Sequence, residues 1–105
     1  MLPLKIWDIA AVLLIKYMDV KVTELSTPGC SHCAEAKKFL EEEFKSKYPQ
    51  VKVEYVSVMD PAGQELVSKH MIFASPGIII NDELFSTGGL DKKPFITKVE
   101  ALLKA

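Results

Sequence analysis

The sequence predicts one α/β domain built on a mixed sheet of four strands. The chain of 105 residues is long enough for one hydrophobic core and too short for two. Strand-like and helix-like segments alternate along it, which is typical of a crossover that joins parallel strands. Two strand-like segments near the C-terminal end are joined through Asn81-Asp82, a pair that favours a tight hairpin turn. We therefore expect parallel and antiparallel pairing within a single domain over residues 1–105.

Residues 1–18 are expected to add an N-terminal helix that packs on the domain. On a helical wheel, Lys5, Asp8 and Lys16 share one stripe, and the opposite side is broad and apolar. The run IAAVLLI at 9–15 has the length of a secretory signal core, but charges surround it and no small-x-small cleavage site follows. It is also too short to span a bilayer. We expect a cytoplasmic protein.

The first strand of the sheet is predicted over residues 20–25. The residue types alternate there, which places Val20, Val22 and Glu24 on one face. The sequence Thr-Pro-Gly then ends the strand, because proline and glycine both favour turns.

A helix follows this break and leads to a second strand. The helix is expected from Ser31 to about Lys47, where apolar residues recur at helical spacing, and Tyr48-Pro49 ends it. Its core-facing residues are Cys33, Ala36, Leu40 and Phe44. The β-branched and aromatic sequence at 51–58 predicts the second strand.

The second half of the chain adds a helix, a hairpin and a last helix. Asp60 at the N-cap position and Pro61 at the first helical position begin a helix that runs to about His70. Short strands are expected over 77–80 and 83–86, and the last helix begins within 91–94. Its core-facing residues are Phe95, Val99, Leu102 and Leu103. The order after residue 18 is therefore β-α-β-α-β-β-α, with a right-handed first crossover.

Charge and cysteine content exclude several classes of function. The formal net charge of −1 gives no electrostatic reason to expect nucleic acid or anionic membrane as a partner. All 13 basic residues are Lys, so the chain lacks the bidentate guanidinium that best suits carboxylate and phosphate ligands. Two cysteines are too few for the disulfide framework of a small secreted protein. We expect a monomer that binds neither nucleic acid nor membrane.

The sequence Cys30-Ser31-His32-Cys33 lies where the first strand gives way to the helix. Unpaired backbone N–H groups and the helix dipole favour negative charge at that end, so they would stabilise a Cys30 thiolate. Cys33 lies one turn along, on the buried face, close enough to form a disulfide but poorly placed to meet an outside substrate. Cys30 is therefore predicted to attack the substrate and Cys33 to resolve the mixed disulfide.

A metal site is the alternative interpretation of the same two cysteines. Zinc takes about four ligands, and only His32 and His70 are obvious further candidates. His32 lies inside the loop between the cysteines. A metal ion or an iron–sulfur cluster would therefore need a second chain, as in a dimeric binding module. We favour redox chemistry that uses the Cys30–Cys33 disulfide and no bound cofactor.

From about residue 20 to its end, the sequence resembles the thioredoxin/glutaredoxin superfamily. Three features carry the resemblance: the Cys-Ser-His-Cys motif after the first strand, Ser-Pro-Gly at 75–77 before the third, and Gly-Gly-Leu-Asp at 88–91 before the last helix. The resemblance implies a thioredoxin fold and a thiol–disulfide oxidoreductase that acts on protein disulfides. Its electrons would come from a partner reductase or a low-molecular-weight thiol, or would flow the opposite way.

The resemblance also implies a set of substrate-binding residues. In that superfamily the proline is cis and packs beside the disulfide, which implies a cis Ser75-Pro76 bond and a Ser75 backbone that pairs with a substrate peptide. Most X-Pro bonds are trans, so the sequence alone favours the other isomer. Gly88 and Gly89 match the Gly-Gly stretch with which glutaredoxins hold the glutathione carboxylate. That stretch lies two residues further from the proline than is typical, and Arg is missing, so we favour a turn followed by an Asp91 N-cap.

Three more residues are candidates for the reaction. Glu24 lies where thioredoxins carry a buried acid, and there it would take and return the Cys33 proton; an acid exposed near a strand end would do neither. His32 departs from the Gly-Pro that thioredoxins typically place between the cysteines. A protonated imidazole would stabilise the thiolate and make the pair more oxidising, whereas a neutral, solvated one would do little. The Ser31 hydroxyl would add a hydrogen bond to the thiolate.

Overall fold

The computed structural model of the chain describes residues 20–104, so the predicted helix over 1–18 lies outside the described residues. In chain order the elements are β1 (Lys21–Ser26), α2 (Ser31–Phe39), η1 (Leu40–Phe44), α3 (Lys45–Lys47), β2 (Lys52–Ser57), α4 (Pro61–His70), β3 (Gly77–Ile80), β4 (Glu83–Thr87) and α5 (Lys92–Lys104). The predicted order is confirmed, and each predicted strand boundary lies within one residue of the observed one. Within 20–104, no helix is long and apolar enough to cross a membrane.

The four strands form one mixed sheet in the order β2-β1-β3-β4. Strands β1 and β2 are parallel, with Lys21 opposite Lys52 and Ser26 opposite Ser57, because the helix between them returns the chain to the same edge. Strand β3 runs antiparallel to β1, and β4 runs antiparallel to β3. Both kinds of predicted pairing are therefore confirmed.

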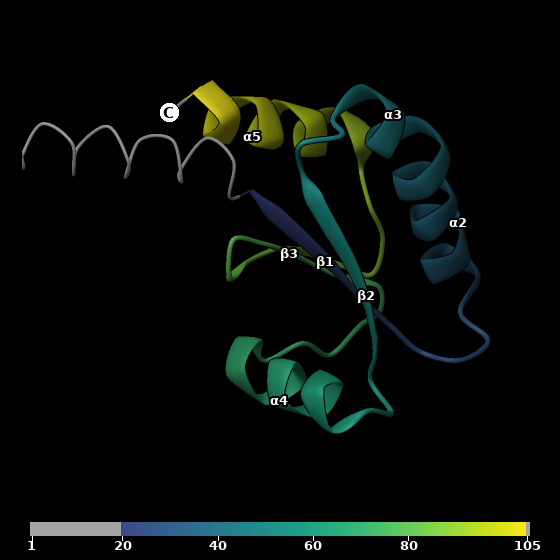
Figure 1. Ribbon diagram of the computed structural model, residues 1–105. Coiled ribbons are helices and arrows are strands. Elements are labelled where there is room, and N and C mark those ends of the chain that lie inside the picture. Colours follow the sequence, from purple (N-terminus) through teal and green to yellow (C-terminus); the bar gives the residue numbers. More distant parts are fainter. Residues whose placement is uncertain (1–19, 105) are drawn as a thin grey trace, which may run out of the picture.

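Helices cover both faces of this sheet, so the molecule has three layers (Figure 1). Helices α2, α3 and α5 lie on one side, and α4 lies alone on the other. The core on the first side contains Val20, Val22, Phe39, Leu40, Phe44, Val51, Ile78, Ile80, Phe95 and Val99. The core on the α4 side is smaller and has Leu25, Ile72 and Ile79 as its buried residues. The two faces of the sheet are thus unequally packed.

Strand β1 is buried more completely than its alternating sequence predicts. Val22 and Glu24 are buried, as expected of the inward face, but Thr23 and Leu25 on the other face are buried too. The reason is position: β1 has a strand on each side and a helix layer over each face. Alternation therefore predicted the correct faces, but it did not predict that both would be covered.

The long helix after the cysteines contains a π-helical segment that residue spacing did not predict. Segment η1 separates α2 from α3, and the Lys45 N–H bonds to the Leu40 carbonyl five residues back. This wider turn lets Phe39, Leu40 and Phe44 all enter the core. The Phe39 and Phe44 rings lie 6.3 Å apart between centroids, and Phe44 also stacks near Phe95 at 5.0 Å. The predicted extent of the helix is confirmed.

The local signals for the hairpin and for α4 are confirmed in most respects. Asn81 and Asp82 both have positive φ, 50° and 69°, as the predicted tight turn requires. Asp60 is the N-cap residue of α4 and Pro61 its first helical residue, but the Asp60 side chain makes no capping hydrogen bond. Near this end α4 approaches β2 so closely that a Cβ on Gly63 would lie 2.7 Å from the Ser57 carbonyl carbon.

Candidate active site

The two cysteines lie at the N-terminal end of α2 and form a disulfide, with their Cα atoms 5.2 Å apart. Cys30 is the N-cap residue and has an extended backbone, so its side chain lies just outside the first turn. The turn before it is possible because Gly29 has a positive φ of 77°, and the Cys30 N–H donates to the Thr27 carbonyl at 3.3 Å. The predicted placement of the pair is confirmed.

The first turn of α2 directs a backbone donor at the outer sulfur. The Cys33 N–H donates to Cys30 Sγ at 3.1 Å, and the first turn contains no acidic residue. In the reduced chain the same N–H and the helix dipole would stabilise a Cys30 thiolate. The two cysteine residues differ in exposure, because Cys30 is partly exposed whereas Cys33 is 5% exposed. An outside disulfide can therefore reach Cys30 far more readily than Cys33.

The Ser75-Pro76 bond is cis, as the resemblance implies, and the segment lies beside Cys30. Ser75 Oγ is 3.7 Å from Cys30 Sγ and also hydrogen-bonds with Thr27 Oγ1. The Gly88 N–H donates to the Pro76 carbonyl at 3.0 Å, so the Gly-Gly loop meets the proline as well. The Ser75-Pro76 segment therefore lies between the disulfide and the Gly-Gly loop.

Glu24 is 1% exposed, so the alternative of a solvent-facing acid is wrong. Burial removes its carboxylate from water and raises its pKa from 4.5 to about 7, against the opposing charge of Lys37. Its Oε2 atom has no hydrogen-bond partner among the described residues. The side chain lines a hollow of about 470 Å³ together with both cysteines. An acid in this place can exchange a proton near pH 7.

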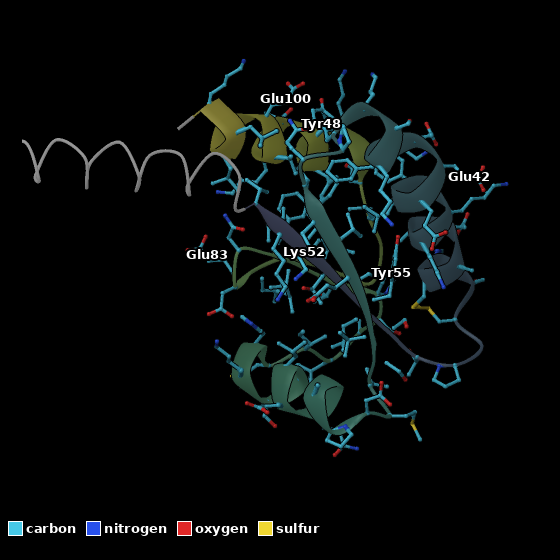
Figure 2. All side chains as sticks on the ribbon, in the orientation of Figure 1. Glu42, Tyr48, Lys52, Tyr55, Glu83 and Glu100 are labelled. Atoms are coloured by element: carbon cyan, nitrogen blue, oxygen red, sulfur yellow. A yellow bond between two sulfur atoms is a disulfide. The ribbon has the colours of Figure 1, made fainter. Side chains whose placement is uncertain are left out.

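Two residues that sequence analysis missed line the same hollow. Tyr55 lies opposite Glu24 in the β1–β2 register, and burial is the main cause that raises its pKa to about 12. Lys37 reaches over it from α2, with Nζ 5.1 Å from the ring centroid. Figure 2 shows Tyr55 between β2 and the beginning of α2, where the sulfur–sulfur bond lies. The register and the helix crossing bring these residues together, and neither is visible in the motif.

Comparison with known proteins agrees with this geometry. A model of the family described as "Thioredoxin domain" matches residues 18–101. The chain belongs to the thioredoxin family. It is 30% identical over 84 residues to a thioredoxin from Methanocaldococcus jannaschii, a match that covers 80% of this chain and 96% of that protein.

Solved structures show the same thioredoxin fold. A thioredoxin-like protein from Clostridium perfringens superposes with a TM-score of 0.66 at 17% identity, covering 79% of this chain and 70% of that one. A thioredoxin from Fasciola hepatica superposes with a TM-score of 0.64 at 15% identity, covering 90% of each chain. The predicted mixed four-stranded thioredoxin fold is thus confirmed over the described residues.

In this thioredoxin-family chain, the His32 side chain is exposed and lies beside an acid. Its side chain is 69% exposed, and Nδ1 lies 3.2 Å from Glu35 Oε1 one turn along the helix. An acid at that distance offsets part of any imidazolium charge that the thiolate would feel. Ser31 is exposed and lines the hollow beside Cys30. The predicted roles of both residues stay predictions.

Gly88 and Gly89 form the turn that we favoured for this segment. Gly88 has a positive φ of 81°, and the Gly89 carbonyl accepts a hydrogen bond from Ser86 Oγ at 3.1 Å. The Asp91 carbonyl accepts from the Phe95 N–H at 3.2 Å, just before α5. Gly89 shares a shallow hollow of about 460 Å³ with His32, so the loop borders the site without closing it.

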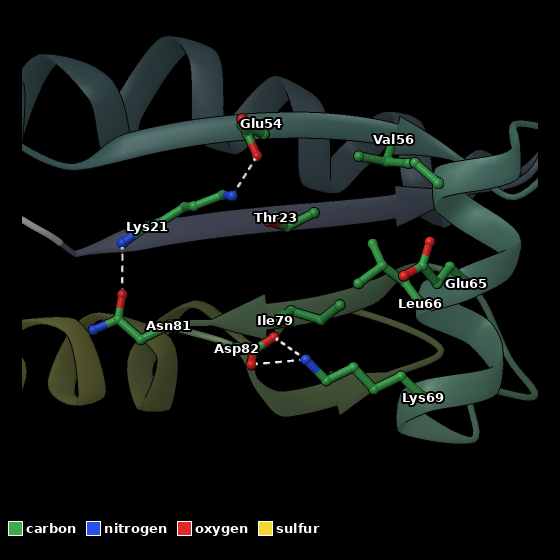
Figure 3. A pocket seen from close by; sticks show the side chains of 11 residues that line it. Lys21, Thr23, Glu54, Val56, Glu65, Leu66, Lys69, Ile79, Asn81 and Asp82 are labelled. Carbon is green, nitrogen blue, oxygen red and sulfur yellow. Dashed lines mark hydrogen bonds and ion pairs between the residues drawn. The ribbon is translucent and has the colours of Figure 1, made fainter.

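A further hollow lies away from the cysteines. It has about 730 Å³, lies between α4 and the sheet, and neither cysteine lines it (Figure 3). Its rim is tied by ion pairs, Lys21 to Glu54 at 2.9 Å and Lys69 to Asp82 at 2.8 Å. These four charged groups are therefore paired with each other.

The described residues offer the two cysteines no further metal ligands. Among residues 20–104, no three His, Cys, Asp or Glu side chains are grouped so that they could hold a metal ion. His70, one of the two candidate ligands, is on α4 and faces Asp82, with Nε2 3.9 Å from Oδ1. The cysteine pair by itself supplies half of a four-coordinate site.

Proposed function

We propose that this chain is a thiol–disulfide oxidoreductase that exchanges its Cys30–Cys33 pair with disulfides of protein substrates. The observation that carries the proposal is the unequal exposure of two cysteine residues at one helix N-terminus, with the Cys30 sulfur accepting a backbone N–H. Membership of the thioredoxin family supports it. The sulfur pair itself stores the two electrons, so the exchange involves no other redox group.

The reductive direction has two steps. The Cys30 thiolate attacks one sulfur of the substrate disulfide; the new Cys30–substrate bond forms, and the other substrate sulfur leaves as a thiolate and takes a proton from water. Cys33 then gives its proton to Glu24 and attacks Cys30 Sγ. The mixed disulfide breaks, the Cys30–Cys33 bond forms, and the second substrate sulfur leaves as a thiolate that takes a proton from water, while Glu24 holds the Cys33 proton until the dithiol is restored. Two electrons pass to the substrate, and a reductase or a low-molecular-weight thiol restores the dithiol.

The backbone beside the disulfide would hold the substrate peptide. Ser75 and the cis proline border Cys30 on one side, and the Gly88-Gly89 loop continues that border. An extended substrate chain that pairs with the Ser75 backbone would present its own disulfide to Cys30. Main-chain pairing of this kind recognises a peptide without requiring one sequence.

Single-cysteine variants test the assignment. Cys33→Ser should trap a mixed disulfide with a protein disulfide substrate such as insulin, because the resolving thiol is gone. Cys30→Ser should lose nearly all insulin reduction with dithiothreitol as electron donor. The measurement is intact mass for the trapped species and turbidity for insulin reduction. Trapping by Cys30→Ser instead would reverse the roles, and full activity in both variants would refute dithiol chemistry.

A further inference from the structure

Two buried oxygen atoms near the disulfide have no hydrogen-bond partner among the described residues: Glu24 Oε2 and Tyr55 Oη. The only other such side-chain atom there is His70 Nε2 on α4. Buried polar groups in folded proteins are nearly always hydrogen-bonded, so each exception needs an explanation. The proposed proton transfer uses Glu24 and gives Tyr55 no role.

The backbone holds these two side chains next to each other. Glu24 and Tyr55 are direct partners in the parallel β1–β2 register, and both side chains line the hollow that contains Cys30 and Cys33. Paired residues on neighbouring strands project to the same face and lie about one strand spacing, ~5 Å, apart. The two oxygen atoms are not hydrogen-bonded to each other in this structure, so a bond between them needs a side-chain rotation.

Lys37 is the charged group that acts on Glu24, and it lowers the Glu24 pKa. The hollow is otherwise lined by both cysteines and by the hydroxyl residues Ser26, Thr27 and Ser31, and the β3 residue paired with Glu24 is Ile78, which does not titrate. Lys37 is placed over the Tyr55 ring, and Glu41 on η1 acts on Tyr55 as a negative charge. Among the hydroxyls of the hollow, Tyr55 is the one that pairs with Glu24 across the sheet and whose oxygen is buried without a partner among the described residues.

We propose that Tyr55 is a positioning residue whose hydroxyl donates a hydrogen bond to the Glu24 carboxylate and so sets the pH at which Glu24 can accept the Cys33 proton. This inference rests on the proposed function. A donor to a carboxylate favours its charged form, so it acts against the desolvation of Glu24. Tyr55 keeps its own proton throughout, because the proton that moves leaves Cys33 and goes to Glu24.

The titration behaviour of Tyr55 is consistent with this donor role. With a pKa of about 12, the phenol stays protonated across the pH range in which Glu24 titrates near 7. The hydroxyl is therefore available as a donor whenever the carboxylate ionises. A phenylalanine at this position would fill the same space without the donor.

The test compares Tyr55→Phe with a matched control, Tyr48→Phe. Tyr48 lies at the end of α3, away from the hollow, and its hydroxyl bonds to Glu100. Carboxyl ¹³C NMR of the oxidised protein follows the Glu24 midpoint directly. Tyr55→Phe should raise that midpoint by about one pH unit, a tenfold change in proton affinity. Tyr48→Phe should leave it in place. An unchanged midpoint in Tyr55→Phe would overturn the proposal.

The pH dependence of insulin reduction is a second measurement, and it would not change if Tyr55 had only a structural role. Two ionisations shape the acid limb of the rate of insulin reduction, that of Cys30 and that of Glu24. The Glu24 part should shift to higher pH in Tyr55→Phe by the same amount as the NMR midpoint, and Glu24→Gln should remove that part and leave the part that follows the Cys30 thiolate titration at 240 nm. If the pH profile of Glu24→Gln equals that of the parent, the proton-acceptor role in the proposed function fails, whatever the NMR shows. If Glu24→Gln changes the profile and Tyr55→Phe does not, the Tyr55 proposal alone fails.

Discussion

Glu24 makes the folded chain less stable as the pH rises, and Glu24→Gln should remove that pH dependence. The carboxyl is 1% exposed, and burial raises its pKa from 4.5 to about 7. An acid whose pKa is raised by folding binds its proton more tightly in the folded chain. Below pH 4.5 the carboxyl is protonated in the folded and the unfolded chain, so it does not lower the free energy of unfolding. The loss of stability grows between pH 4.5 and about 7 and is constant above that.

The size of this penalty follows from the two pKa values. The rise from 4.5 to about 7 corresponds to about 3 kcal/mol in the free energy of unfolding. Glutamine imitates the protonated acid at every pH. Glu24→Gln should therefore match the parent near pH 4 and exceed it by about 3 kcal/mol at pH 8, which is about 10 °C or more in melting temperature for a domain of this size.

Urea unfolding of the oxidised protein between pH 4 and pH 9 measures the difference. Glu65→Gln is a matched control, because Glu65 is exposed on α4 and lies away from the disulfide. The control should follow the parent at every pH. A stability difference between Glu24→Gln and the parent that is the same at pH 4 and pH 8 would refute the linkage between Glu24 ionisation and folding.

Two further predictions follow from close contacts. Gly63→Ala should lower the free energy of unfolding by about 2 kcal/mol in urea, because a Cβ would lie 2.7 Å from the Ser57 carbonyl carbon. Gly89→Ala, where nothing lies within 4 Å of a Cβ, should be nearly neutral, and equal losses would contradict the steric argument. His32→Gln should move the thiolate titration at 240 nm upward by about half a pH unit, a small shift because Glu35 offsets the imidazolium; no shift would make His32 a spacer.

The sequence contained enough local chemistry to predict the order of elements and the cysteine pair. The hairpin followed from Asn81-Asp82, whose positive φ angles few other residue pairs adopt readily. The asymmetry of Cys30 and Cys33 followed from helical spacing. Both features depend on residues close together in the sequence, so short sequence patterns were enough to predict them.

Features that depend on distant elements were not predictable from the same patterns. The face of Glu24 followed from alternation, but its burial depends on the covering of β1 from both sides. Tyr55 and Lys37 were missed because strand register and helix crossing bring them to the acid. The π-helical turn at η1 was not predictable either, because helical periodicity assumes a constant number of residues per turn.

The unequal cores on the two faces of the sheet give the two sides of the catalytic centre different local stability. Opening α4 would expose Leu25, Ile72 and Ile79, a far smaller apolar surface than the aromatic core under α2. The cysteines are at the N-terminal end of α2, whereas the Ser75-Pro76 segment follows α4. The next residue, Gly77, lies so close to Ile72 that a Cβ on it would be 3.1 Å from Ile72 Cδ1. Sub-global opening of α4 should therefore loosen the proposed substrate border while Cys30 and Cys33 keep their geometry. Under the proposed function, substrates of different shape would then meet one fixed nucleophile.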